Sequence, residues 1–177
     1  ADTIKEGSVI AIRALRSLGI ETVMLTGDNA RTARAIARQV GIDEALGDQL
    51  PEDKLRVIER HIGEGKFVGM VGDGINDAPA LARADIGFAM GAAGSDTAIE
   101  TADVALMDDD LNKIARFVQL SRKTRRVLIQ NITLALGIKA IFLGLTLVGY
   151  GTMWMAVFAD MGASLLVVGN GLRLVRQ

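Results

Sequence analysis

The sequence contains no cysteine among its 177 residues. A disulfide-bonded scaffold and a thiolate metal site within this chain are therefore excluded. Basic residues are not in excess, because 20 lysines and arginines are balanced by 21 aspartates and glutamates, and this argues against a nucleic-acid partner. Residues 1–20 lack an apolar segment with a basic flank, so no signal peptide is visible. Because the first residue is Ala1 rather than methionine, we expect the chain to continue upstream.

Charge is distributed unevenly along the chain. Residues 127–177 contain only four charged side chains, so the first 126 residues contain the other 37 of 41. The four are Lys139, Asp160, Arg173 and Arg176. Half of all residues are hydrophobic while 23% are charged, a combination that is rare in a single soluble domain. The sequence therefore predicts a charged soluble part followed by a membrane part.

The soluble part alternates between the two periodicities of regular structure. Apolar residues at helical spacing predict helices over residues 5–18, 30–40, 52–62 and 78–84. Short apolar runs predict buried strands over residues 21–26, 67–71, 86–90 and 104–107. This alternation predicts an α/β fold of the Rossmann type, with a parallel sheet covered by helices on both faces.

Two of the predicted strands end in loops rich in glycine and acidic residues. The first strand continues into Gly27-Asp28-Asn29, and the second continues into residues 72–79. Each loop alone could be an ordinary turn. Ligands bind beyond the carboxyl ends of parallel strands, however, so two such loops on one sheet predict a site.

The residue types in these loops favour phosphoryl chemistry. Asp73 and Asp77 are four residues apart, so both carboxylates can face one Mg²⁺, which prefers oxygen ligands. Thr26 and the backbone amide of Gly27 offer hydrogen-bond donors to a phosphoryl group. Lys54 could supply a positive charge, although alone it would be interpreted as a solvated surface lysine.

Three strings in this region resemble a known family. They are MLTGDN (24–29), LPEDK (50–54) and MVGDGINDAPAL (70–81). Together and in this order they resemble the phosphorylation domain of P-type ATPases, cation pumps of the haloacid dehalogenase-like superfamily. The resemblance continues through the apolar segments and covers essentially the whole chain.

The resemblance implies a role for each matching residue. Residues that match the catalytic machinery are Thr26, Gly27, Asp28, Lys54, Asn76 and Asp77. Thr26, Gly27 and Asp28 match the segment that holds the phosphoryl group and orients hydrolysis, and Lys54 matches the lysine that neutralises the phosphoaspartate. Asp73 matches the Mg²⁺ ligand, with Asn76 and Asp77 around it. Positioning and charge neutralisation are what phosphoryl transfer needs most.

One part of the family pattern is absent. The phosphorylated aspartate belongs to a DKTGT motif, which does not occur in these residues, and neither does the domain that binds most of the ATP. We therefore expect the C-terminal part of a pump, which alone neither autophosphorylates nor turns over ATP. Its expected parts are a phosphorylation-domain portion (1–110), a stalk helix (111–126) and the last two transmembrane helices (127–177). Its expected partners are the lipid bilayer and the missing N-terminal part.

Two apolar segments, 127–150 and 153–172, are each long enough to cross a membrane. Basic residues flank both segments at the same end, and the turn between the segments is uncharged. Basic flanks favour the cytoplasmic side. We therefore expect a multi-pass protein of the cell membrane, with the phosphorylation domain and the C-terminus in the cytoplasm.

Each apolar segment contains one charge near its middle, Lys139 in the first and Asp160 in the second. Charges at this depth are costly and usually mark an ion path, although a buried ion pair that only fixes helix packing is the alternative. The pair resembles the zinc, cadmium and lead exporters, which have a lysine in the penultimate helix and an aspartate in the last. In this resemblance Asp160 binds the transported Zn²⁺, Cd²⁺ or Pb²⁺, and Lys139 is the counter-charge of the empty site.

Two alternatives remain at this point. Copper-transporting P-type ATPases place a methionine and serine cluster in the last helix, which Met161 and Ser164 partly match, but their tyrosine–asparagine pair is absent near Lys139. The other alternative is a membrane-anchored phosphatase or non-catalytic module with the same fold. A phosphatase would need its own nucleophile strand, and a binding module would not need Lys139 and Asp160 at matching depth.

Overall fold

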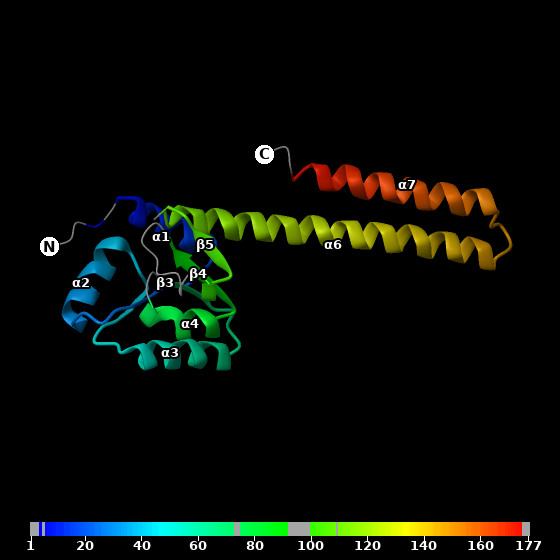
Figure 1. The fold of residues 1–177 in the computed structure, drawn as a ribbon. Coiled ribbons are helices and arrows are strands. Elements are labelled where there is room, and N and C mark those ends of the chain that lie inside the picture. The colour runs from blue at the N-terminus through cyan, green and yellow to red at the C-terminus, as the bar shows by residue number, and fades with distance from the viewer. Residues whose placement is uncertain (1–3, 5, 73–74, 92–99, 109, 175–177) are drawn as a thin grey trace. The chain divides into compact units, whose positions relative to one another are not determined.

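The computed structural model describes residues 4, 6–72, 75–91, 100–108 and 110–174. The chain divides into two compact units, residues 1–116 and residues 117–177 (Figure 1). The predicted Mg²⁺ ligand Asp73 lies outside the described residues.

The first unit alternates helices and strands. Its elements are α1 (Glu6–Ser17), β1 (Val23–Leu25), α2 (Ala30–Val40), β2 (Glu44–Leu46), α3 (Pro51–Gly63), β3 (Gly69–Gly72), a 3₁₀ turn (Ile75–Asp77), α4 (Ala78–Arg83), β4 (Ile86–Met90) and β5 (Val104–Leu106). All strand pairs are parallel. The predicted α/β fold with parallel strands is thereby confirmed.

The strands form two sheets rather than the single sheet that was expected. β1 pairs with β2, and β3, β4 and β5 form a second sheet in that order. The expectation that both polar loops end strands of one hydrogen-bonded sheet was therefore wrong. β2 was not predicted, because three residues that begin with an exposed glutamate, Glu44, give no apolar run.

Both faces of the second sheet are covered by helices. Side chains alternate between the faces along β4, so Ala89 joins a cluster with residues of α3 and α4, whereas Phe88 packs with Leu106 and Ile114. Leu15 of α1 packs against the Phe88 cluster. α3 and α4 lie together on the other side of this sheet (Figure 1).

α2 begins and ends at the predicted residues for local reasons. Asn29 precedes the helix, and its side-chain oxygen accepts a hydrogen bond from the backbone N–H of Thr32 at 2.9 Å. Gly41 follows the helix with φ of 86°, a left-handed conformation that favours glycine. The start of α2 is thus fixed next to the first polar loop.

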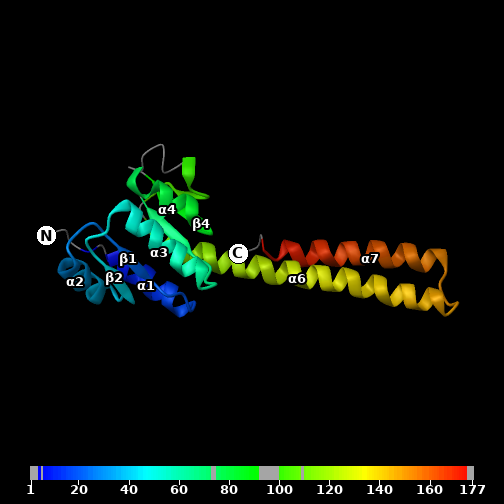
Figure 2. The same cartoon turned by 90° about the horizontal axis from the view of Figure 1, so that it is seen from below.

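The second unit consists of two antiparallel helices joined by a short turn. α6 (Asn112–Leu147) begins in the first unit, and α7 (Met153–Leu172) follows it. Both are long and apolar enough to cross a membrane. The two helices lie side by side along the hairpin (Figure 2). The bounds of α7 match the sequence prediction, and the expected stalk helix continues into the first apolar segment as the single helix α6.

Candidate functional site

A buried ion pair joins α3 to the start of α4. Lys54 Nζ lies 2.7 Å from Asp77 Oδ1, and the two side chains are only 15% and 13% exposed. Lys54 is on the first turn of α3, which begins at Pro51, and Asp53 accepts a hydrogen bond from the backbone N–H of Leu50. Two predicted site residues, 23 positions apart in the sequence, are thus in direct contact.

Gly72 allows Asp77 to occupy this position. A Cβ built on Gly72 would lie 2.7 Å from Asp77 Cβ and 3.0 Å from its Oδ2. Distances this short are not found for real side chains, so the carboxylate occupies space that any larger residue at the end of β3 would need. Lys54 holds one carboxylate oxygen while the other lies over Gly72.

The first polar loop is held by the segment that leads into α3. The backbone N–H of Thr26 donates to the carbonyl of Leu46 at 3.1 Å, and the carbonyl of Thr26 accepts from the N–H of Gln49 at 3.0 Å. Thr26 Oγ1 accepts from the backbone N–H of Asp28 at 3.1 Å. The loop is therefore fixed against residues that lie immediately before the helix of Lys54.

Asp48 contributes to this loop and was missed in the sequence. Its backbone N–H donates to the carbonyl of Asp28, and its Oδ2 accepts from the N–H of Ala30 at 3.1 Å. Asp48 has a φ of 56°, in the left-handed region that aspartate enters more readily than most residues. Its position between Gly47 and a later Pro51 was the available signal, since such residues favour turns.

The predicted residues of the first unit are only partly brought together. Lys54 and Asp77 pair, and Thr26, Gly27 and Asp28 form a loop next to the start of α3. Among the described residues, no hydrogen bond connects this loop to Asp77. Asn76 is exposed in the 3₁₀ turn Ile75–Asp77, directly before Asp77 in the sequence.

The donor groups near Asp77 fit a Mg²⁺ ion that is held by few protein ligands. Within the described ranges no cluster of three or more acidic or histidine side chains occurs. Mg²⁺ usually takes one or two carboxylates and completes its shell with waters and phosphate oxygens, so a larger protein cluster is not needed. Asp77 Oδ2, the carboxylate oxygen that does not bond Lys54, lies over Gly72, and one such carboxylate fits this kind of coordination.

A second candidate site lies in the hairpin of α6 and α7. Lys139 Nζ lies 3.5 Å from Asp160 Oδ1, so the two isolated charges of the apolar helices form an ion pair. The side chains of both residues are about two-thirds exposed, at 66% and 67%. The pair therefore links the two helices at the surface of the hairpin and is not buried in the interface between them.

Comparisons with known proteins find relatives over nearly the whole chain. The family of haloacid dehalogenase-like hydrolases matches residues 1–85. A probable cadmium-transporting ATPase of Listeria monocytogenes is 58% identical over 99% of this chain, and a zinc-transporting ATPase of Synechocystis is 52% identical over 99%. The chain spans 25% of the length of each of these curated relatives. A solved zinc-transporting PIB-type ATPase in an E2.Pi state superposes with a TM-score of 0.92 at 47% identity, covering 99% of this chain and 28% of the other.

The parallel strands and the family match over residues 1–85 identify the first unit as a haloacid dehalogenase-like domain. Two apolar helices follow this domain, as in the solved pump. The chain belongs to the P-type ATPases. The relatives it matches are named as zinc- or cadmium-transporting ATPases, and the chain spans about a quarter of their length.

Proposed function

We propose that this chain is the C-terminal part of an ATP-driven pump that exports zinc, cadmium or lead ions across a membrane. The observation that supports this proposal best is the Lys139–Asp160 pair, at 3.5 Å across two apolar helices. The similarity to zinc- and cadmium-transporting ATPases extends over the same residues. The cell membrane is the proposed location, with the phosphorylation domain and the C-terminus on its cytoplasmic side.

Asp160 is the proposed ligand of the transported ion. Its carboxylate supplies an anionic oxygen to a divalent cation, and Lys139 neutralises it when no cation is bound. Charged side chains facing lipid at this depth cost about 3 kcal/mol each on insertion scales. The exposed sides of both residues are therefore proposed to face other transport helices of the whole pump, which would supply the remaining ligands.

This role is tested by Lys139→Ala and Asp160→Ala in the whole pump. Each variant should abolish the ATPase activity that zinc or cadmium stimulates. Lys113→Ala is the control, because Lys113 forms an exposed ion pair with Asp108 outside the apolar part of the hairpin. Unchanged stimulation in Asp160→Ala would assign the pair to helix packing, and stimulation of the wild-type pump by copper alone would favour the copper-transporting class.

The proposed role of the first unit is Mg²⁺-dependent phosphoryl chemistry. Thr26, the amide of Gly27 and Asp28 hold and orient the phosphoryl group, and Lys54 contributes positive charge while it fixes Asp77. Asp73 and Asp77 would hold Mg²⁺, with Asn76 beside them, and the bound ion would neutralise charge on the phosphoryl group. The phosphorylated aspartate and most of the ATP site are proposed to come from the rest of the pump.

A further inference from the structure

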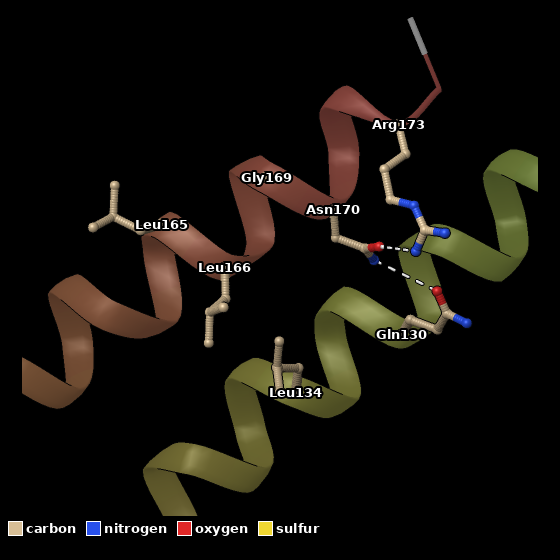
Figure 3. A pocket seen from close by; sticks show the side chains of 7 residues that line it. All are labelled: Gln130, Leu134, Leu165, Leu166, Gly169, Asn170 and Arg173. Carbon is tan, nitrogen blue, oxygen red and sulfur yellow. Dashed lines mark hydrogen bonds between the residues drawn. The ribbon is translucent and has the colours of Figure 1, made fainter. Parts of the chain in front are cut away.

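A cluster of amide side chains joins the two helices near the charged end of the hairpin. Asn170 Nδ2 of α7 donates to Asn131 Oδ1 of α6 at 2.8 Å. The same amide group lies 3.5 Å from Gln130 Oε1, and Asn170 Oδ1 lies 3.5 Å from an Nη1 of Arg173 (Figure 3). Asn170 thus uses both ends of its amide, one of them across the hairpin.

The amide cluster and the ion pair both join α6 to α7, at two different levels along the hairpin. Asn131 precedes Lys139 by eight residues on α6, and Asn170 follows Asp160 by ten residues on the antiparallel α7. At about 1.5 Å per residue these separations are about 12 and 15 Å, so a cross-link at one level restricts sliding at the other. The Leu134 and Leu166 side chains between the two levels are apolar and give little register of their own (Figure 3).

The geometry of the ion pair depends on α6 and α7 not sliding along one another, because the hairpin does not enclose the two charged side chains. Lys139 and Asp160 touch at 3.5 Å while both side chains remain about two-thirds exposed, so neither is confined by neighbours in the hairpin. A slide of one residue along either axis would displace one charge relative to the other by about 1.5 Å. The 2.8 Å hydrogen bond between the side-chain amides of Asn170 and Asn131 is a polar cross-link that opposes such a slide.

We propose that Asn131 and Asn170 are positioning residues that set the register of α6 and α7 and thereby the placement of Asp160 for the transported ion. This inference rests on the proposed transport function. The amide pair touches neither Lys139 nor Asp160 and acts through the helix axes. Its loss weakens cation binding without removing any ligand.

The register is tested first without any transport measurement. The chain has no cysteine, so Ile141→Cys and Phe158→Cys place two nitroxide labels at exposed positions of α6 and α7. Distances between the labels are measured by double electron–electron resonance in phospholipid vesicles. Asn170→Leu should broaden or shift the distance distribution, whereas Thr133→Val, an exposed polar-to-apolar change on α6, should not. Identical distributions for the parent and Asn170→Leu would overturn the proposal.

The effect on the ion is then measured in the whole pump. Asn170→Leu should raise the zinc concentration for half-maximal ATPase activity about fivefold, the size expected for one interhelical hydrogen bond in a membrane, with kcat changed less than about twofold. Asn170→Gln, which retains the amide, should restore most of the affinity. An unchanged zinc dependence together with an altered label distance would overturn the positioning role. If Asp160→Ala also leaves stimulation intact, the proposed transport function fails, and the label distances still decide the register separately.

Discussion

At the residue scale, the Lys54–Asp77 pair is the least exposed ion pair among the described residues. Removing one partner of a buried pair leaves the other charge without compensation. Lys54→Met should therefore destabilise the region around α3 and α4 by about 3 kcal/mol, measured as lost amide protection by hydrogen exchange and mass spectrometry. Arg83→Met, which breaks the half-exposed pair with Glu59, should cost less than about 1 kcal/mol.

Comparing Lys54→Met with Arg83→Met also separates two functions of Lys54, which are neutralising the phosphoryl group and holding Asp77 in place. If this lysine only neutralised the phosphoryl group, protection of α3 and α4 in Lys54→Met would equal that of Arg83→Met in the absence of any nucleotide. A larger loss of protection means that the lysine also holds Asp77 in place. Asp77→Asn is informative for the same reason, because it keeps the shape of the side chain and removes the charge that Lys54 compensates.

A second residue-scale prediction concerns pH. Hydrogen bonds from the backbone N–H of Thr22 at 2.9 Å and from its Oγ1 at 2.8 Å, together with Arg16, hold the pKa of Asp43 below its ordinary value of 3.8. A lowered pKa in the folded state gives stability above the ordinary pKa that is lost as pH falls through the folded pKa. Asp43→Asn should thus be less stable than wild type at pH 7, and the difference should shrink below about pH 4.

Urea unfolding of both proteins at pH 7, 5 and 3 in detergent measures this difference. Values at pH 7 and 5 should agree, because the ionised carboxylate is present at both. A difference that grows as the solution is acidified would contradict the assignment. Glu44→Gln is the control, since Glu44 is exposed beside Asp43 on β2.

At the scale of the elements, β3 ends in a glycine because the next turn brings Asp77 against it. Gly72→Ala places a methyl group 2.7 Å from Asp77 Cβ, so Asp77 and the pair with Lys54 must move. Overpacking of this kind costs about 1–3 kcal/mol. Gly69→Ala, on the same strand, meets Ile86 at 3.5 Å, an ordinary contact, and should be tolerated.

ATPase activity and thermal unfolding of the whole pump measure the two glycine variants side by side. Gly72→Ala should lose most activity with a lowered melting temperature, while Gly69→Ala keeps both near wild type. Equal behaviour of the two variants would show that the space above Gly72 is not needed for Asp77.

The sequence predicted those elements whose local signals are strong. The helix over residues 30–40 and the strand over 86–90 were placed correctly, because caps define the helix and a run that is buried in its middle defines the strand. β2 was missed, since its pairing with β1 comes from the parallel partner and not from its own composition. The Lys54–Asp77 contact was equally invisible, because no local pattern relates a helix to a turn 23 residues later.

At the scale of the whole molecule, the first unit has open strand edges. Within the described residues β1 pairs only with β2, and β3 pairs only with β4, so each leaves one edge without a strand partner. Unpaired edges are costly unless another segment covers them. We expect the rest of the pump to supply a strand there and, with it, the DKTGT aspartate that these 177 residues lack.

We therefore expect the chain to be inactive alone and to restore activity when it is combined with the preceding part of the pump. Incubated with γ-labelled ATP and Mg²⁺, the 177-residue chain should acquire no acid-stable label. Co-expressed with the preceding part of the same pump as a separate polypeptide, it should restore labelling of that polypeptide and remain unlabelled itself. The carboxylate that is proposed to accept phosphate is on one polypeptide, while Lys54 and Asp77 are on the other.

Two variants of this chain serve to test whether the complementation depends on Asp77. Asp77→Ala should abolish labelling of the other polypeptide, because the aspartate that is proposed to hold Mg²⁺ is removed, whereas Arg83→Ala on the exposed face of α4 should not. Acid-stable label on the 177-residue chain alone would show that it contains its own nucleophile. Labelling that persists with Asp77→Ala would mean that Asp77 is not required for phosphorylation.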